Sequence, residues 1–191
     1  MKAMEGRYAS NLLDNHTIVM QQTRTMLVSD YDILDVAGNP IATVATTVAG
    51  AEGSFTGPKE FVIVDASGPL CILIDPPDLG ADRFEAFHPN GAPLARIIQQ
   101  LRFFTTAVSI EVAGGSVMEI IGNFLDCTFE IRSGGLPVAH ATRDAPQIED
   151  WVLAKDRYLV HLDPNMPPNY RLALVSGLVA LNQLREKWSK R

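Results

Sequence analysis

The sequence predicts a mainly β protein, in which an antiparallel sheet closes, or nearly closes, into a barrel around its own C-terminal helix. Three observations predict this fold class. Short strand-like runs recur along most of the 191 residues, turns rich in Gly and Pro separate them, and a run of ten apolar or small residues, Leu172 to Leu181, ends the pattern. A chain of this length buries one sizeable core, and many hairpins in sequence are typical of closed antiparallel sheets.

Four turns share one pattern, in which Gly occupies the turn and Pro stands at or near the start of the next strand. Gly tolerates the positive φ of tight turns, and Pro is tolerated where a strand begins because its missing N–H is not needed there. The four segments are 36–42, 65–71, 88–95 and 133–139.

Apolar and polar residues alternate before several of these turns, as expected for strands with one face in the core and one in water. The runs that precede the four turns are 31–36, 60–65, 83–87 and 127–132. A fifth hairpin, without Pro, is predicted from 108–112 and 117–121, joined by Gly114 and Gly115. The apolar spacing of 94–100 alone would allow a helix as well as a strand.

The last element is predicted to be a helix capped by Asn169, with basic residues near its end that suit the helix dipole. Between Leu172 and Leu181 only Ser176 is polar, and a helix of this kind must be surrounded by other elements. Ten helical residues span about 15 Å, half the thickness of a bilayer core. We therefore expect the sheet to enclose the helix. The residues predicted to be buried on it are Leu172, Leu174, Val175, Leu178 and Leu181.

Composition and charge exclude several classes of protein. With 47% hydrophobic and 20% charged residues, the chain as a whole is not intrinsically disordered. Its net charge of −6 argues against a broad nucleic-acid surface.

Cys71 and Cys127 both lie in apolar runs and are predicted to be buried free thiols. The first fifteen residues hold no apolar block of the signal-peptide kind, so a cytoplasmic location is expected.

Side chains that support catalysis or metal binding do not cluster in recognisable motifs. The four histidines lie far apart, and none has metal-site spacing to another His or to a Cys: His16, His88, His140 and His161. No motif assembles a nucleophile, a base and an oxyanion site, so we expect the protein not to be an enzyme.

The ordered series of strands resembles the phospholipid scramblases and the plant LURP-one-related proteins, which share the tubby C-terminal-like fold. The segments that carry the resemblance are 17–22, 31–33 with the Gly38 turn, 61–65 with Gly68, 84–87 with Gly91, and 129–132, followed by the short apolar helix. It runs from about Leu12 to Trp188, which implies one domain over 12–188 after an N-terminal tail, 1–11. In that family the barrel has about twelve strands and encloses the helix, which also makes 94–100 a strand.

The same resemblance implies a non-catalytic, lipid-interacting protein of scramblase type. Such a protein binds phospholipid at a membrane surface and moves phospholipids between leaflets. No cofactor is expected. The family's Ca²⁺ segment lies before the last helix, and here only Asp156 matches its acidic residues, because Ala154 stands at the first acidic position and the cationic Arg157 opposes Ca²⁺. Anionic lipid would meet the basic cluster Arg185, Lys187, Lys190 and Arg191.

The alternative is a soluble scaffold or partner-binding barrel of LURP-one-related type with no lipid activity. Exposed loops on rigid barrels often carry recognition. The loops that would contact a protein partner are 49–59, 75–82 and 143–151. In the last of these, Trp151 beside Glu149 and Asp150 would either anchor the partner or pack on the open end of the barrel. The residues leave the two functions open.

Overall fold

The computed structural model describes residues 8–24, 29–48, 59–76, 83–101, 106–123, 128–143 and 157–188. These residues form twelve strands and one α-helix, with a short 3₁₀ turn, η1 (Leu12–Asp14), ahead of the first strand. The strands are β1 (Thr17–Arg24), β2 (Ser29–Leu34), β3 (Pro40–Val48), β4 (Lys59–Asp65), β5 (Gly68–Asp75), β6 (Arg83–Phe87), β7 (Pro93–Leu101), β8 (Thr106–Val112), β9 (Val117–Asn123), β10 (Thr128–Ser133), β11 (Leu136–Arg143) and β12 (Arg157–Leu162). The helix is α1 (Pro168–Trp188).

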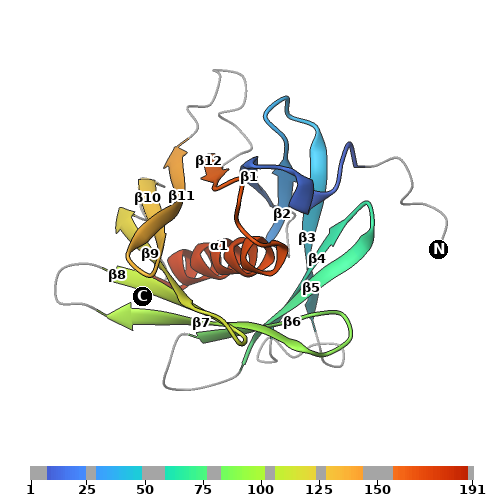
Figure 1. Ribbon diagram of the computed structural model, residues 1–191. Coiled ribbons are helices and arrows are strands. Elements are labelled where there is room, and N and C mark those ends of the chain that lie inside the picture. Colours follow the sequence, from blue (N-terminus) through green and yellow to red (C-terminus); the bar gives the residue numbers. More distant parts are fainter. Residues whose placement is uncertain are drawn as a thin grey trace.

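The strands form a closed antiparallel barrel, as predicted. Each strand pairs with the next in sequence, and β12 pairs with β1 to close the wall. Figure 1 shows α1 in the middle of the barrel, with the wall of strands around it. The segment 94–100, for which apolar spacing alone left helix and strand open, lies in β7.

Alternating burial divides each strand between the barrel interior and the outer face. In β4, Phe61, Ile63 and Asp65 point inward, and the residues between them are partly exposed. On α1 every residue from 171 to 184 is buried, because the wall surrounds the helix on all sides. Its five predicted core residues are at most 4% exposed: Leu172, Leu174, Val175, Leu178 and Leu181.

The Gly and Pro of the repeated turns have separate structural roles. The predicted turn glycines have positive φ, for example 85° at Gly38 and 83° at Gly91. Each of the four prolines stands where the strand pairing shifts register, in the pairs Leu34–Pro40, Val64–Pro69, Phe87–Pro93 and Arg132–Pro137. A β-bulge accommodates Pro because the residue at a bulge need not donate to the ladder.

The start of α1 differs from the prediction. Asn169 is an exposed residue inside the first turn, and Pro168 is the first helical residue. Pro suits this position because its φ is preset for a helix and the missing N–H would have no helical partner. The amides of Tyr170 and Arg171 both donate to the carbonyl oxygen of Pro167, at 3.0 and 3.1 Å.

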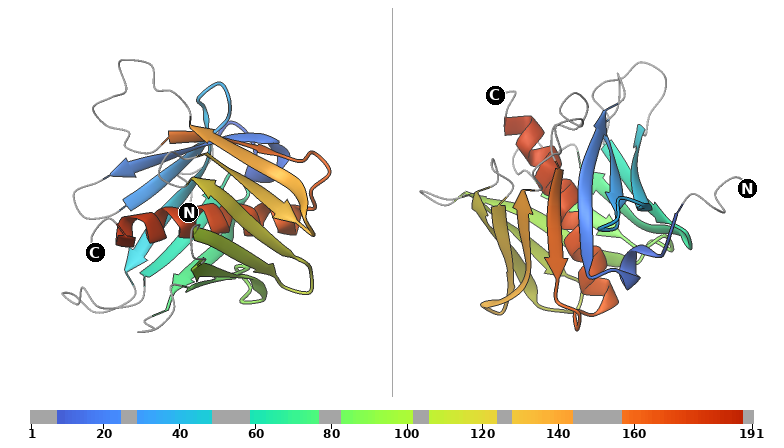
Figure 2. Two further views of the ribbon diagram at one scale, coloured as in Figure 1. Left: turned by 90° about the vertical axis from the view of Figure 1, so that its left-hand side faces the viewer. Right: turned by 90° about the horizontal axis from the view of Figure 1, so that it is seen from above.

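The two ends of the barrel have different connections. At one end, which we call the turn end, tight turns join β2 to β3, β4 to β5, β6 to β7, β8 to β9 and β10 to β11. Six other segments, 25–28, 49–58, 77–82, 102–105, 124–127 and 144–156, join the strands at the opposite end, which we call the loop rim. Because α1 follows β12 at the turn end and runs back through the barrel, it ends at the loop rim (Figure 2).

Candidate functional site

Buried hydrogen bonds hold α1 to the wall near the loop rim. Gln183 Nε2 donates to the hydroxyl of Tyr31 at 2.8 Å, and Asn182 Nδ2 donates to the hydroxyl of Tyr158 at 3.0 Å. All four side chains are at most 5% exposed. Buried polar groups without partners are costly, so these bonds fix both the rotation and the depth of the helix.

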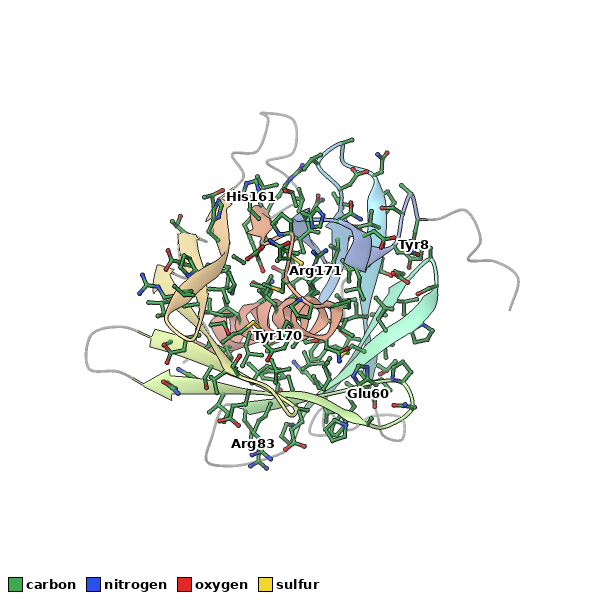
Figure 3. The ribbon with its side chains drawn as sticks, viewed as in Figure 1. Tyr8, Glu60, Arg83, His161, Tyr170 and Arg171 are labelled. Atoms are coloured by element: carbon green, nitrogen blue, oxygen red, sulfur yellow. The ribbon has the colours of Figure 1, made fainter. Side chains whose placement is uncertain are left out.

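At the turn end, Arg171 holds the start of the helix. Its guanidinium group donates to three backbone carbonyl oxygens, those of Met166 at 3.0 Å, Leu13 at 2.8 Å and Pro164 at 2.6 Å. Beside it, the hydroxyl of Tyr170 accepts a hydrogen bond from the amide of Ser116 at 2.9 Å (Figure 3). The start of α1 is therefore bonded to η1, to the segment that joins β12 to α1, and to the β8–β9 turn.

The middle of the barrel holds an unreactive thiol. Cys71 is fully buried, as predicted, and its Sγ lies 3.2 Å from Ser176 Oγ on α1. Burial raises the pKa of this thiol to about 11, and the hydrogen bond to Ser176 opposes the shift only in part. Because the thiolate is the nucleophile, Cys71 is a packing residue at neutral pH. Cys127 lies outside the described residues.

The loop rim is where the predicted partner loops leave the wall. Ranges 49–59, 75–82 and 143–151 are bordered by the ends of β3, β5 and β11 and the starts of β4, β6 and β12, all at that end. Most of these ranges, Trp151 included, lies outside the described residues. The six rim segments contain two basic residues, Arg102 and Lys155. Their eight acidic residues are Glu52, Asp78, Asp82, Asp126, Asp144, Glu149, Asp150 and Asp156.

The residues predicted to bind calcium or lipid come from two parts of the sequence, the segment before β12 and the last part of the chain from Arg185 onward. Asp156, Lys190 and Arg191 lie outside the described residues. Arg185 and Lys187 belong to the last turns of α1, and the structure describes their backbone but not their side chains. Their proposed roles therefore stay predictions.

Strand register brings together two histidines that are far apart in sequence. His140 of β11 and His161 of β12 are direct cross-strand partners on the outer face, and their rings stack with centroids 4.7 Å apart. They line a shallow hollow with Glu130 of β10 and with Asp163. Sequence spacing could not reveal this pair, because it depends on which residues of β11 and β12 face each other. Among the described residues no three His, Cys, Asp or Glu side chains are arranged to hold a metal ion.

Comparison with known proteins agrees with the barrel and its closing helix. The family model described as LURP-one-related matches residues 16–180. The chain belongs to the LURP-one-related family. No curated protein matches it. A solved structure of the Arabidopsis thaliana protein AT5G01750 matches with a TM-score of 0.57 at 18% identity, over 89% of this chain and 92% of that chain.

Membership of the LURP-one-related family confirms the resemblance found in the sequence, and the Arabidopsis structure shows that the two proteins share a fold. Within the described part of this LURP-one-related chain, no helix combines the length and hydropathy needed to cross a bilayer.

Proposed function

We propose that this LURP-one-related chain is a non-catalytic barrel that binds a protein partner through its loop rim. One observation carries the proposal: the strands that lead into 49–59, 75–82 and 143–151, and the strands that follow these ranges, all have their nearer termini at the same end of the barrel. A rigid wall can thus present three separate sequence ranges to one partner, which is how barrels commonly carry recognition.

The composition of the rim segments favours a protein partner with a basic surface. Eight acidic residues against two basic ones give these segments a negative balance. The same segments contain five aromatic residues, Phe55, Phe103, Phe104, Phe124 and Trp151. Aromatic side chains are preferred anchors at protein interfaces, and complementary charge speeds and orients the encounter. An anionic membrane surface would instead repel the acidic segments.

The fixed helix supports a function that works from the outside of the barrel. Release of α1 would break the three carbonyl contacts of Arg171 and the buried pairs Gln183–Tyr31 and Asn182–Tyr158. It would also expose the apolar residues from 172 to 181 together with the wall that covers them. Each of these losses opposes a mechanism in which the helix leaves the barrel to enter a bilayer.

Site-specific photo-crosslinking tests the proposal. Benzoylphenylalanine placed at Phe55 or at Trp151, both in rim segments, should crosslink the full chain to the same protein in extracts of its own cells. Val36 provides the control, because it is 71% exposed and lies in the β2–β3 turn at the turn end. Equal crosslinking from Val36, or different proteins from Phe55 and Trp151, would contradict a common surface at the rim.

Peripheral phospholipid binding is the second candidate, and the place where α1 ends favours it. The basic residues Arg185, Lys187, Lys190 and Arg191 belong to or follow the part of α1 that reaches the loop rim. Salt-sensitive flotation with anionic vesicles, lost when all four become Gln, would support this function. If that flotation depended on both Ca²⁺ and Asp156, the function would be of the scramblase type. If the protein floated with neither neutral nor anionic vesicles, with and without Ca²⁺, phospholipid binding would be excluded.

A further inference from the structure

We propose that the outer wall carries a two-histidine site for a divalent transition-metal ion such as Cu²⁺ or Zn²⁺, formed by His140 and His161. The site is independent of the loop rim, since it lies on the face of β11 and β12. Burial of Ala139, Ala141 and Val160 inside the barrel directs both imidazoles outward. Figure 3 shows His161 on the wall, away from α1.

The spacing of the rings suits one shared ion. Their centroids are 4.7 Å apart and their planes are inclined by 29°. With metal–nitrogen bonds of about 2.0–2.1 Å, two imidazoles bound to one ion hold their centroids about 4.5–5 Å apart. Rotation of the side chains, without movement of the strands, is therefore enough to direct one nitrogen of each ring at the ion. The direct cross-strand pairing of the two residues keeps this spacing constant.

The hydrogen bonds of the two rings leave the ligand positions open. Thr17 Oγ1 lies 3.1 Å from His161 Nδ1, so Nε2 of that ring remains for the ion. An Nδ1–H that donates to the threonine oxygen is the kind of outer contact that orients metal-binding histidines. His140 forms no side-chain hydrogen bond with the described residues, and its outward face is exposed. Either of its nitrogens can therefore turn to the ion.

The surroundings favour a cation and decide its class. Glu130 and Asp163 border the hollow and contribute negative charge. Each already has a partner, since Glu130 forms an ion pair with Arg132 and Asp163 accepts from the amide of Asn165 at 2.8 Å. We therefore assign them an electrostatic role and leave the other ligand positions to water. Imidazole ligands select copper, zinc and nickel over calcium and magnesium, which prefer oxygen.

Calorimetric titration of the full chain, carrying no histidine tag, with Cu²⁺ and separately with Zn²⁺ tests the site. We expect one ion per chain and at least a tenfold loss of affinity in His140→Ala and in His161→Ala. Thr17→Val should weaken binding by about tenfold, the size expected when an outer-shell contact is lost. His88→Ala is the matched control, because His88 lies at the β6–β7 turn.

Two further readouts separate metal ligation from a structural role. Electron paramagnetic resonance of the Cu²⁺ complex should show two coordinated imidazole nitrogens in the wild-type chain and one in either alanine variant. Without metal, the variants should melt with the wild type, because both side chains are on the outer face. Retention of full affinity in His161→Ala, a single-imidazole signature in the wild type, or the absence of saturable binding would each overturn the proposal.

Discussion

Gly177 of α1 lies directly against Ile110 of β8. A Cβ added at position 177 would lie 2.9 Å from Ile110 Cγ1 and closer still to Ile110 Cδ1, with Ile120 Cδ1 at 3.9 Å. Ile110 and Ile120 are fully buried, so they have little room to move. The helix therefore packs against the wall at a distance that leaves no space for one methyl group.

Substitution of Gly177 tests this close approach. Gly177→Asp should abolish folding, because an unpaired charge in the core costs several kcal/mol. Gly177→Ala should be milder, and Ile110→Val in the same chain should recover part of its loss by removing Cδ1. Urea unfolding of Gly177→Ala, Ile110→Val and the double variant gives the coupling free energy between positions 177 and 110. A soluble Gly177→Asp protein with an unchanged melting temperature would mean that the helix is not enclosed.

Loss of the buried guanidinium should destabilise the fold. Arg171→Met removes the donors to three backbone carbonyl oxygens, and we expect the free energy of unfolding to fall by about 3 kcal/mol. Arg171→Lys should recover only part, because an ammonium group cannot reproduce the planar fork. The control is Arg96→Met, since Arg96 is exposed and 3.9 Å from Glu85. Arg96→Met should change the free energy of unfolding by no more than about 0.5 kcal/mol. Equal losses for Arg171→Met and Arg96→Met in urea unfolding would contradict a structural role for Arg171.

The thiol of Cys71 should react only when the protein unfolds. In a Cys127→Ser background, iodoacetamide at about pH 8 should modify Cys71 at the rate of global opening, because burial keeps the thiol protonated. Its raised pKa also means that its contribution to stability is complete below the unfolded value of 9.0 and is lost as pH rises through about 11. Rapid, stoichiometric alkylation of the native chain would show that the thiol is accessible.

Acid should weaken the β2–β3 turn. Hydrogen bonds from the side chain and amide of Asn39, and from the amide of Ala37, lower the pKa of Asp35 below its ordinary value of 3.8. Stability from this carboxylate is therefore present above that value and is lost as pH falls through the folded-state pKa. Wild type should exceed Asp35→Asn in urea midpoint at about pH 7, and the difference should shrink at about pH 3. A constant difference would exclude this linkage.

Local chemistry in the sequence was enough to predict the hairpins and the enclosed helix. The positive φ of Gly38 and Gly91 and the burial of Leu174 follow from residue type and pattern. The bulges at the four prolines were missed, although the missing N–H that places Pro at a bulge was visible in the sequence. A Pro at the start of a strand is equally compatible with an unbroken register, so only the pairing decides.

Residues whose role depends on distant partners could not be predicted. Arg171, Asn182 and Gln183 are all buried, because backbone carbonyl oxygens accept hydrogen bonds from Arg171 and tyrosine hydroxyls accept them from the side-chain amide nitrogens of Asn182 and Gln183. The pairing of His140 with His161 likewise depends on the β11–β12 register, which no sequence spacing encodes.

The central claim is that α1 is a permanent core element and that binding takes place outside the barrel. Hydrogen exchange of the α1 amides, followed by mass spectrometry with and without anionic vesicles, tests it most directly. We predict that residues 172–184 exchange only through global unfolding, at the same rate as the central strands and unchanged by vesicles. Faster exchange of this segment than of the strands, or a vesicle-dependent change confined to it, would show that the helix leaves the barrel and would contradict the claim.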